Sequence, residues 1–161
     1  LPDLSDAALG ASLEHWLAPW LGGLTRRTQL ARLSLAEILG AQLSHAQRQL
    51  LARLAPAQLT MPTGSQLPVD YTDPAAPSVA VRLQEVFGLA TTPRVGADTV
   101  PVTFTLLSPA RRPVQVTRDL ASFWRSGYVE VRKDLRGRYP KHYWPENPLE
   151  AEPTRGVKRR R

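Results

Sequence analysis

The stretch VPVTFTLLSPARRPVQVT, residues 100–117, carries the clearest β-strand pattern in the chain. Its first half alternates apolar side chains with threonines, which is the period of a strand with one buried face. The segment SPARRP is rich in turn-forming residues and leads into VQV, a second short strand. We therefore predict a β-hairpin whose first strand directs Val100, Val102, Phe104 and Leu106 into the core.

A second pair of short strands is predicted upstream of this hairpin. The segments LTM (residues 59–61) and LPVDY (residues 67–71) flank the turn sequence PTGS. Between the two hairpins, VAVRLQEVFG (residues 79–88) has apolar residues at helical spacing and ends in a glycine. This spacing predicts a helix over 79–88 that is capped by Gly88.

The first part of the chain is predicted to be helical. Apolar side chains recur at helical spacing over residues 9–20, which predicts one helix with Trp16 and Trp20 facing a core. The sequences SLAE and SHAQ, which begin at Ser34 and Ser44, have the form of capping boxes. They predict the starts of two further helices.

A long helix is predicted to begin at Thr117 or Asp119. Six apolar side chains form a single stripe along it, at Leu120, Phe123, Trp124, Tyr128, Val131 and Leu135. Such a stripe is typical of a helix that packs on a core. The opposite face carries four cations, Arg125, Arg132, Lys133 and Arg136, together with two acidic residues.

These patterns predict an α+β fold. N-terminal helices precede a small, mostly antiparallel β-sheet or partial barrel, which is followed by an extended basic C-terminal ribbon; two further helices accompany the sheet. We expect three parts: a helical segment over residues 1–55, an α+β accessory domain over 56–135 that ends with the long helix, and a proline-rich basic ribbon and tail over 136–161.

The positive charge is concentrated near the C-terminus. The net charge of the chain is +7, and residues 121–161 hold eleven Lys and Arg side chains against five Asp and Glu. This asymmetry favours an acidic partner, and nucleic acid is the usual one. For the final VKRRR alone, a solvated tail is an equally good interpretation.

Several functional classes lack their residues in this sequence. There is no cysteine, no P-loop sequence, and the three histidines lie in different segments without metal-ligand spacing. We therefore expect no catalytic residue, no metal site and no cofactor in this chain. The apolar runs are too short to cross a membrane, and the lack of cysteine fits a reducing compartment, so we expect a cytoplasmic protein with no membrane partner.

The segment RGRYPKHYWPENPLEAEP, residues 136–153, is unlike the rest of the chain. Its prolines favour an extended backbone, and two functions fit that ribbon. It could bind a single strand, with cations on phosphates and aromatic rings on bases. It could instead be a structural strap whose aromatic rings pack on the fold. The candidate nucleic-acid contacts are the four helix cations with Arg138, Tyr139, Lys141, His142 and Trp144.

Three motifs, MPTGSQLPVDY, LLSPARRPVQVT and RGRYPKHYWPENP, resemble the C-terminal region of HrpB-type bacterial ATP-dependent helicases of the DEAH/RHA group. The resemblance covers nearly the whole chain and is most specific over residues 56–155. It implies motor domains upstream that carry the P-loop, the DEAH box and the sites for ATP and Mg²⁺. It also implies that this chain includes or follows part of an oligonucleotide-binding region, to which the two hairpins would belong.

The leading hypothesis is thus a non-catalytic C-terminal accessory domain of a DEAH-type helicase. It would contact RNA or another single strand, or dock on the motor domains. The alternative is a protein-interaction module whose ribbon is only a strap and which has no direct role with nucleic acid.

Overall fold

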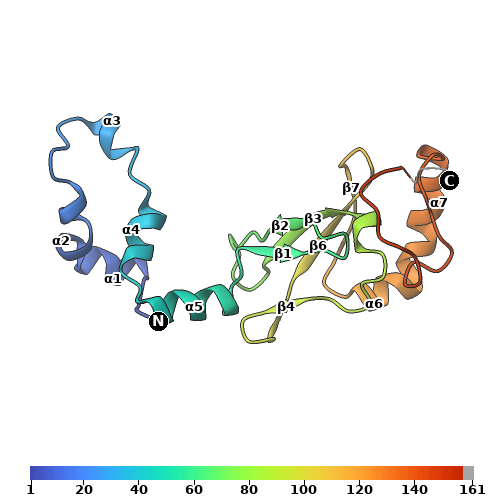
Figure 1. Ribbon diagram of the computed structural model, residues 1–161, viewed down its shortest axis with the longest axis horizontal. Helices are drawn as coiled ribbons and strands as arrows, with labels where there is room; N and C mark the ends of the chain where they lie inside the picture. Colours follow the sequence, from blue (N-terminus) through green and yellow to red (C-terminus); the bar gives the residue numbers. More distant parts are fainter. Residues whose placement is uncertain (158–161) are drawn as a thin grey trace. The chain divides into compact units, whose positions relative to one another are not determined.

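The structure, a computed structural model, describes residues 1–157 and shows two compact units. The first comprises Leu1–Arg53 and the second begins at Leu54. Figure 1 shows helices in the first unit, and strands followed by a long helix in the second. The basic tail predicted at residues 158–161 lies outside the described residues.

The helical unit consists of short helices. These are α1 (Asp6–Ala11), α2 (Leu13–Trp16), the 3₁₀ helix η1 (Ala18–Trp20), α3 (Arg27–Leu30), α4 (Leu35–Ala41) and α5 (His45–Leu54). The single helix predicted over 9–20 was wrong, because three separate helices occupy that stretch. The Ser12 hydroxyl donates to the Ala8 carbonyl at 2.8 Å at the end of α1, and Pro19 lacks the N–H needed to continue a helix.

Local caps organise the later helices of this unit. The Ser34 hydroxyl accepts from the Glu37 N–H at 3.4 Å. At α5 both halves of the predicted capping box are present: the Gln47 N–H donates to Ser44 Oγ at 3.2 Å, and the Ser44 N–H donates to Gln47 Oε1 at 2.8 Å. The core placement of Trp20 was wrong, since its side chain is 48% exposed.

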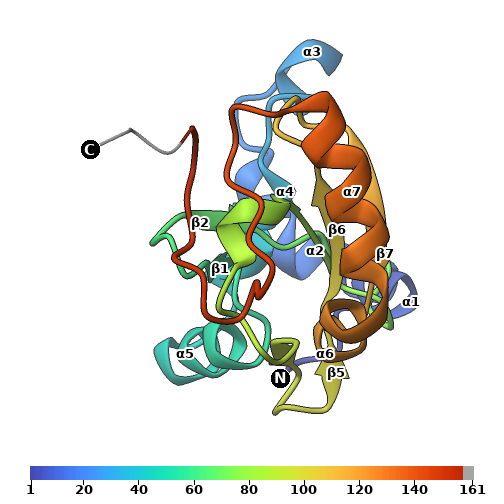
Figure 2. The same ribbon diagram turned by 90° about the vertical axis from the view of Figure 1, so that its right-hand side faces the viewer.

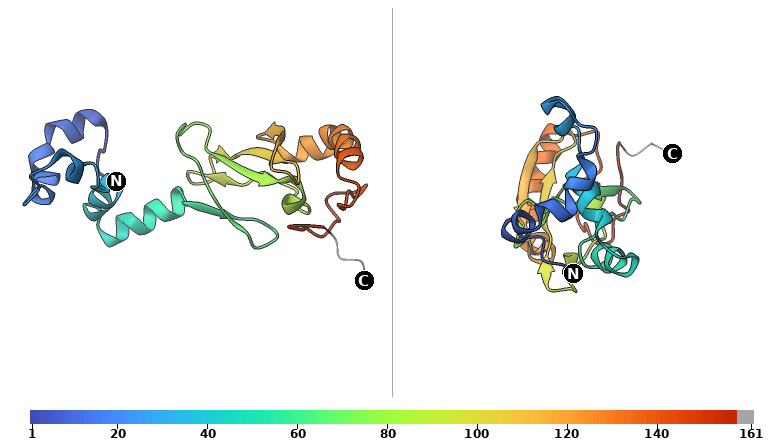
Figure 3. Two further views of the ribbon diagram at one scale, coloured as in Figure 1. Left: turned by 90° about the horizontal axis from the view of Figure 1, so that it is seen from above. Right: turned by 90° about the vertical axis from the view of Figure 1, so that its left-hand side faces the viewer.

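In the described part of the chain, the sheet unit contains seven strands. They are β1 (Gln58–Thr60), β2 (Gln66–Pro68), β3 (Ser78–Arg82), β4 (Arg94–Val95), β5 (Val100–Pro101), β6 (Thr103–Leu107) and β7 (Pro113–Thr117). Both predicted hairpins are confirmed, as β1–β2 and β6–β7 are antiparallel pairs. β4 and β5 form a third antiparallel pair. The strands of this unit are seen from above in Figure 3.

The helix predicted over residues 79–88 was wrong. Its first half is strand β3, which pairs parallel with β6, so that Val79 lies opposite Phe104 and Val81 opposite Leu106. The β-branched Val79 and Val81 alternate with Ala80 and bury one face, which is strand periodicity. Only the 3₁₀ helix η2 (Leu83–Val86) follows. The apolar side chains that suggested a helix are buried both in β3 and in the η2 segment that follows it.

The long C-terminal helix is confirmed and contains one irregular turn. It runs as α6 (Leu120–Ser122), a π-helical turn η3 (Phe123–Gly127) and α7 (Tyr128–Arg138). Asp119 caps it, because its Oδ1 accepts from the Ser122 N–H at 2.9 Å. The predicted stripe faces the core together with Phe104 and Leu106 of β6. Figure 2 views the sheet unit from the side of α7.

The α+β class is confirmed. Three of the four strand pairs are antiparallel, and the strands of the described part of the chain form separate small sheets and no closed barrel. Within residues 1–157, no helix has the length and apolar character required to cross a membrane.

Candidate nucleic-acid interface

The C-terminal ribbon follows α7 as irregular chain over residues 139–157. The first three residues of the segment predicted to be extended, 136–138, instead form the last turn of α7. The helix ends at Arg138 because Pro140 disfavours helical backbone at the residue before it, Tyr139. We call residues 139–157 the ribbon.

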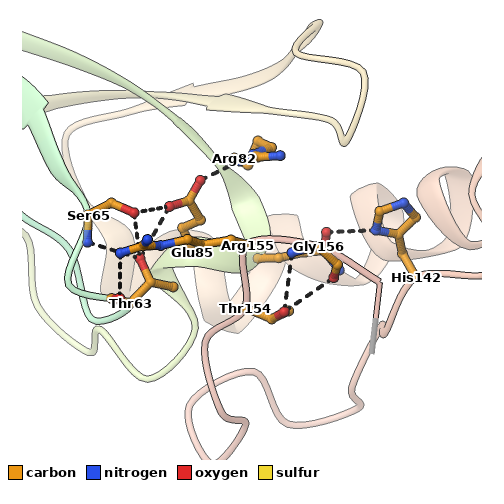
Figure 4. Close-up of polar contacts among 9 residues, drawn as sticks. Thr63, Ser65, Arg82, Glu85, His142, Thr154, Arg155 and Gly156 are labelled. Atoms are coloured by element: carbon orange, nitrogen blue, oxygen red, sulfur yellow. Dashed lines mark hydrogen bonds and ion pairs between the residues drawn. The ribbon is translucent and has the colours of Figure 1, made fainter. Parts of the chain in front are cut away.

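A single buried glutamine fastens the ribbon to η2. Gln84 is 2% exposed, and its Nε2 donates to the Tyr143 carbonyl at 3.2 Å. Its Oε1 lies 3.1 Å from His142 Nδ1, and its carbonyl accepts from the Thr154 N–H at 2.9 Å. Figure 4 shows two of the ribbon residues, His142 and Thr154. One residue thus holds the ribbon at three points.

The ribbon is also held by the long helix. Trp144 is 7% exposed, and its Nε1 donates to the Tyr139 carbonyl at 2.9 Å. Arg132 Nε donates to the Trp144 carbonyl at 3.1 Å, and the Tyr128 hydroxyl donates to the Pro145 carbonyl at 2.8 Å. Burial raises the pKa of Tyr128 well above its usual range. Because Trp144 is buried, its ring faces are not available to stack on bases, which favours the strap interpretation for this side chain.

The other predicted contact residues divide into two groups. Arg132 and His142 form hydrogen bonds that attach the ribbon to the rest of the unit. Arg132 also lies 3.6 Å from a Glu146 carboxylate oxygen. Burial lowers the pKa of His142, and the positive charge of Arg82 lowers it further. The exposed group comprises Arg125, Lys133, Arg136, Arg138 and Lys141. Of these, Arg138 forms a surface ion pair with Asp134 at 3.1 Å.

Tyr139 connects the end of α7 to the β6–β7 turn. Its half-buried side chain places the hydroxyl 3.5 Å from Ser108 Oγ. Ser108 Oγ also accepts from the Arg112 N–H at 3.2 Å. Four exposed cations lie within four residues of Ser108 or Tyr139 along the chain, and we call them the basic rim: Arg111 and Arg112 from the turn, and Arg138 and Lys141 from either side of Tyr139.

A groove of about 530 Å³ opens beside the basic rim. Its walls are residues 65–67 at the start of β2, residues 80–82 of β3, and Leu107 and Arg111 of the β6–β7 hairpin. We call it the β2–β3 groove. Because Arg111 belongs to both features, the groove and the rim are continuous.

A buried carboxylate lies in the wall of this groove. The Glu85 side chain is 7% exposed and accepts from Ser65 Oγ at 2.7 Å, from Thr63 Oγ1 at 3.2 Å and from Arg82 Nε at 3.1 Å. Arg155 of the ribbon donates to the Thr63 carbonyl at 2.9 Å. Figure 4 shows these side chains around Glu85. The charge is thus paired and hydrogen-bonded, as a buried carboxylate requires.

The sequence interpretation missed Arg82, Gln84, Glu85, Arg111 and Arg112. The first three lie in the segment interpreted as a helix, where they had the appearance of ordinary surface positions. Arg111 and Arg112 were regarded only as parts of a turn. Two adjacent arginines in a tight turn are the signal that could have revealed this site. Among residues 1–157, no group of three His, Cys, Asp or Glu side chains is placed to hold a metal ion.

Comparison with known proteins identifies the family of this chain. A protein-family model described as the C-terminal region of ATP-dependent helicases, HrpB_C, matches residues 16–148. This chain belongs to the HrpB C-terminal family. It is 43% identical over 158 residues to the ATP-dependent RNA helicase HrpB of Escherichia coli (strain K12), an alignment that covers 98% of this chain. The chain spans 20% of the length of that curated relative.

Two solved structures support the family assignment. A crystal structure of the E. coli DExH-box NTPase HrpB matches with a TM-score of 0.88 and 44% identity, over 96% of this chain and 19% of that one. A crystal structure of the Escherichia coli DEAH/RHA helicase HrpB matches with a TM-score of 0.71 and 41% identity, over 89% of this chain and 18% of that one. The resemblance inferred from three sequence motifs is therefore confirmed.

Proposed function

We propose that this chain is a non-catalytic accessory region of an HrpB-type helicase and that it contributes contacts to RNA or another single strand. The observation that carries the proposal is the basic rim, four exposed cations on the two segments that the Tyr139–Ser108 contact joins. ATP, Mg²⁺ and hydrolysis belong to the motor domains of the family, outside this chain. RNA enters the proposal because the E. coli relative is named an RNA helicase.

The strap and the nucleic-acid contact are compatible in this arrangement. The ribbon directs Trp144 inward, where burial of the ring stabilises the fold, and leaves Lys141 outside. Exposed cations at fixed positions attract phosphates and release condensed counterions when they bind them. Three predicted helix contacts, Arg125, Lys133 and Arg136, remain exposed and extend the positively charged surface along the helix. The ribbon therefore serves as a scaffold for the charges.

Fluorescence anisotropy with a labelled oligouridylate of about ten nucleotides tests this proposal. Each phosphate contact contributes about 0.7 to the slope of log affinity against log salt for single strands. The double variant Arg138→Gln/Lys141→Gln should therefore bind more weakly and reduce the slope by about 1.4. Arg27→Gln/Arg53→Gln, which removes two exposed cations from the helical unit, is the control. The absence of binding, or equal slopes in both variants, would contradict the proposal.

Docking of the helical unit on the motor domains is the second candidate. Seven large apolar side chains are exposed in this unit, at Leu1, Leu4, Leu13, Trp20, Leu30, Leu35 and Leu51, whereas only Ile38 and Leu43 are buried among its larger apolar residues. Such a surface is typical of a protein contact. Hydrogen exchange compares residues 1–53 in this chain and in a protein that also carries the motor domains. Slower exchange of α4 and α5 in the longer protein supports docking, and equal exchange would contradict it.

A further inference from the structure

Glu85 orients Arg82 but engages only one of its hydrogen-bond donors. Its Nε donates to Glu85 Oε1 at 3.1 Å, and its side chain remains 28% exposed. Within residues 1–157 its two terminal nitrogens have no hydrogen-bond partner. A guanidinium has five N–H donors in a planar fork, and one bond at Nε leaves the outer pair free. That outer pair has the geometry for a bidentate contact with a phosphate.

The orientation of Arg82 depends on neighbouring polar contacts. Glu85 Oε2 accepts from two hydroxyls of the β1–β2 turn, those of Ser65 and Thr63, and this fixes the carboxylate that aligns the guanidinium. Arg155 secures the same turn through the Thr63 carbonyl. A cation held in place before binding loses less conformational entropy when its ligand arrives. Glu85 and Thr63 are therefore positioning residues for Arg82.

The β2–β3 groove has the size and charge for an anionic group. Its volume of about 530 Å³ lies within the range of small-molecule sites. Two arginines, Arg82 and Arg111, line it against the single carboxylate of Glu85, which is already engaged. Arg111 also belongs to the basic rim. A strand that lies on the rim would therefore reach the groove without leaving positively charged surface.

We infer that the β2–β3 groove binds one backbone phosphate of a single strand, with Arg82 as its bidentate donor and Arg111 as a second cation. The inference rests on the proposed function and specifies where the strand continues beyond the basic rim. A purely structural ion pair between Arg82 and Glu85 is the competing explanation, because residues three apart at the start of a helical turn often pair. The two explanations differ in what Glu85 does to binding.

The first test replaces Arg82 in this chain by glutamine. Arg82→Gln should weaken binding of the oligouridylate about tenfold and reduce the salt slope by about 0.7, as expected for one lost phosphate contact. Arg118→Gln is the matched control, because Arg118 is an exposed arginine beyond the opposite end of β7, next to Thr117. If Arg82→Gln behaves like Arg118→Gln while the rim variant still loses affinity, the groove is not a site and the proposed function stands.

The second test uses Glu85→Gln, for which the competing explanations predict opposite signs. If the ion pair is purely structural, Glu85 affects a bound strand only through its negative charge, and removing that charge should tighten binding. If Glu85 positions Arg82, the variant should bind more weakly despite its greater positive charge. Tighter binding would overturn the positioning role. Should this variant fail to fold, as judged by circular dichroism, Thr63→Val removes one support of the carboxylate and is expected to weaken binding in the same direction.

A third measurement identifies the source of the phosphate. Amide resonances of Ser65, Gln66 and Arg82 are followed by NMR during titration with sodium phosphate alone and with the oligouridylate. We expect the oligouridylate to shift them at far lower concentration. If inorganic phosphate shifts them as readily, the groove binds a free anion and the inference fails. If the oligouridylate binds nowhere on the chain, the proposed function and this inference fail together.

Discussion

The helical unit and the sheet unit are stabilised in different ways. Eighteen of the twenty buried hydrophobic residues in the described part of the chain belong to the sheet unit, and seventeen of them form one core cluster that includes residues of the long helix. The helical unit has the other two, Ile38 and Leu43, and relies on caps such as the Ser44–Gln47 box. Contacts distant in sequence hold one unit, and local contacts hold the other.

The helical unit therefore needs a source of stability other than a core of its own. Its longest helix, α5, has ten residues, and isolated helices shorter than about 12–15 residues are marginal in water. Caps contribute about 1 kcal/mol each and do not replace a core. The exposed leucines of this unit are therefore the expected source of further stability, through the docking proposed above. The sheet unit needs no such partner for its core.

The largest expected effect contrasts the same substitution in the two units. Leu106 is 0% exposed and Leu51 is 40% exposed. Leu106→Ala should reduce the free energy of unfolding by about 2–5 kcal/mol, because it leaves a cavity in the core. Leu51→Ala should change it by less than about 0.5 kcal/mol. Urea unfolding measures both, and a large loss for Leu51→Ala would show a hidden core in the helical unit.

The next prediction is a glycine-to-alanine substitution that should lower stability in the sheet unit and raise it in the helical unit. A Cβ on Gly127 would lie 2.8 Å from Phe123 Cδ2, and that ring is packed 5.0 Å from the Trp124 ring. Gly127→Ala should therefore destabilise the sheet unit by about 1–3 kcal/mol. A Cβ on Gly10, within α1, would meet nothing within 4 Å. Gly10→Ala should stabilise that helix by about 0.5–1 kcal/mol, detectable as increased helical circular dichroism.

The same contrast explains what could be predicted from the sequence. Features set by residues close in the chain were predicted well: the complete Ser44–Gln47 capping box, the Ser34 hydroxyl cap of the other predicted box, the two hairpins and the Asp119-capped long helix. Helix periodicity failed over residues 79–88 because a parallel neighbour, β6, decides that VAV becomes a strand. Such a partner is remote in sequence, and no local pattern in 79–88 reveals it. The first helix breaks at Ser12, whose hydroxyl donates to the Ala8 carbonyl, and hydrophobic periodicity does not encode such a side-chain hydrogen bond.

The site was predicted only in part, for a related reason. Composition identified the basic C-terminal region, and Arg138 and Lys141 were found because they lie within it. Arg111 became part of the site only through the Tyr139–Ser108 contact, which joins residues 31 apart. Arg82 and Glu85 acquired their relation to the groove from the pairing of β3 with β6. Pro140 and Pro145 predicted an extended ribbon and not a helix, but its attachment to the fold depends on Gln84, far away in the sequence.

A smaller effect concerns the loss of a single hydrogen bond, which should affect distant residues in the sheet unit but only neighbouring residues in the helical unit. Tyr128→Phe removes the hydrogen bond to the Pro145 carbonyl and should cost about 1 kcal/mol. Ser44→Ala removes a helix cap and should cost about the same. Hydrogen exchange separates them: we expect faster exchange across both the ribbon and α7 in the first variant, and only within the first turns of α5 in the second. Equally local changes in both variants would contradict the comparison.

The smallest effect concerns pH and the attachment of the ribbon. Burial against Gln84, with the charge of Arg82 nearby, lowers the pKa of His142 in the folded chain. The unfolded chain, in which a histidine titrates near about 6.5, then binds the proton more readily. The contribution of this ring to stability is therefore complete above that pH and is lost as the pH falls through 6.5 towards the folded value.

Urea unfolding at about pH 7.5 and about pH 5.5 measures this loss. The decrease in the free energy of unfolding should be larger in the natural chain than in His142→Gln, whose amide cannot gain a proton. NMR titration of the imidazole protons gives the folded pKa directly, and a value at or above 6.5 would contradict the expected direction. Because acid acts on the ribbon through one half-buried ring and leaves the apolar core around Phe104 and Tyr128 unchanged, the decrease should be small and the sheet unit should remain folded.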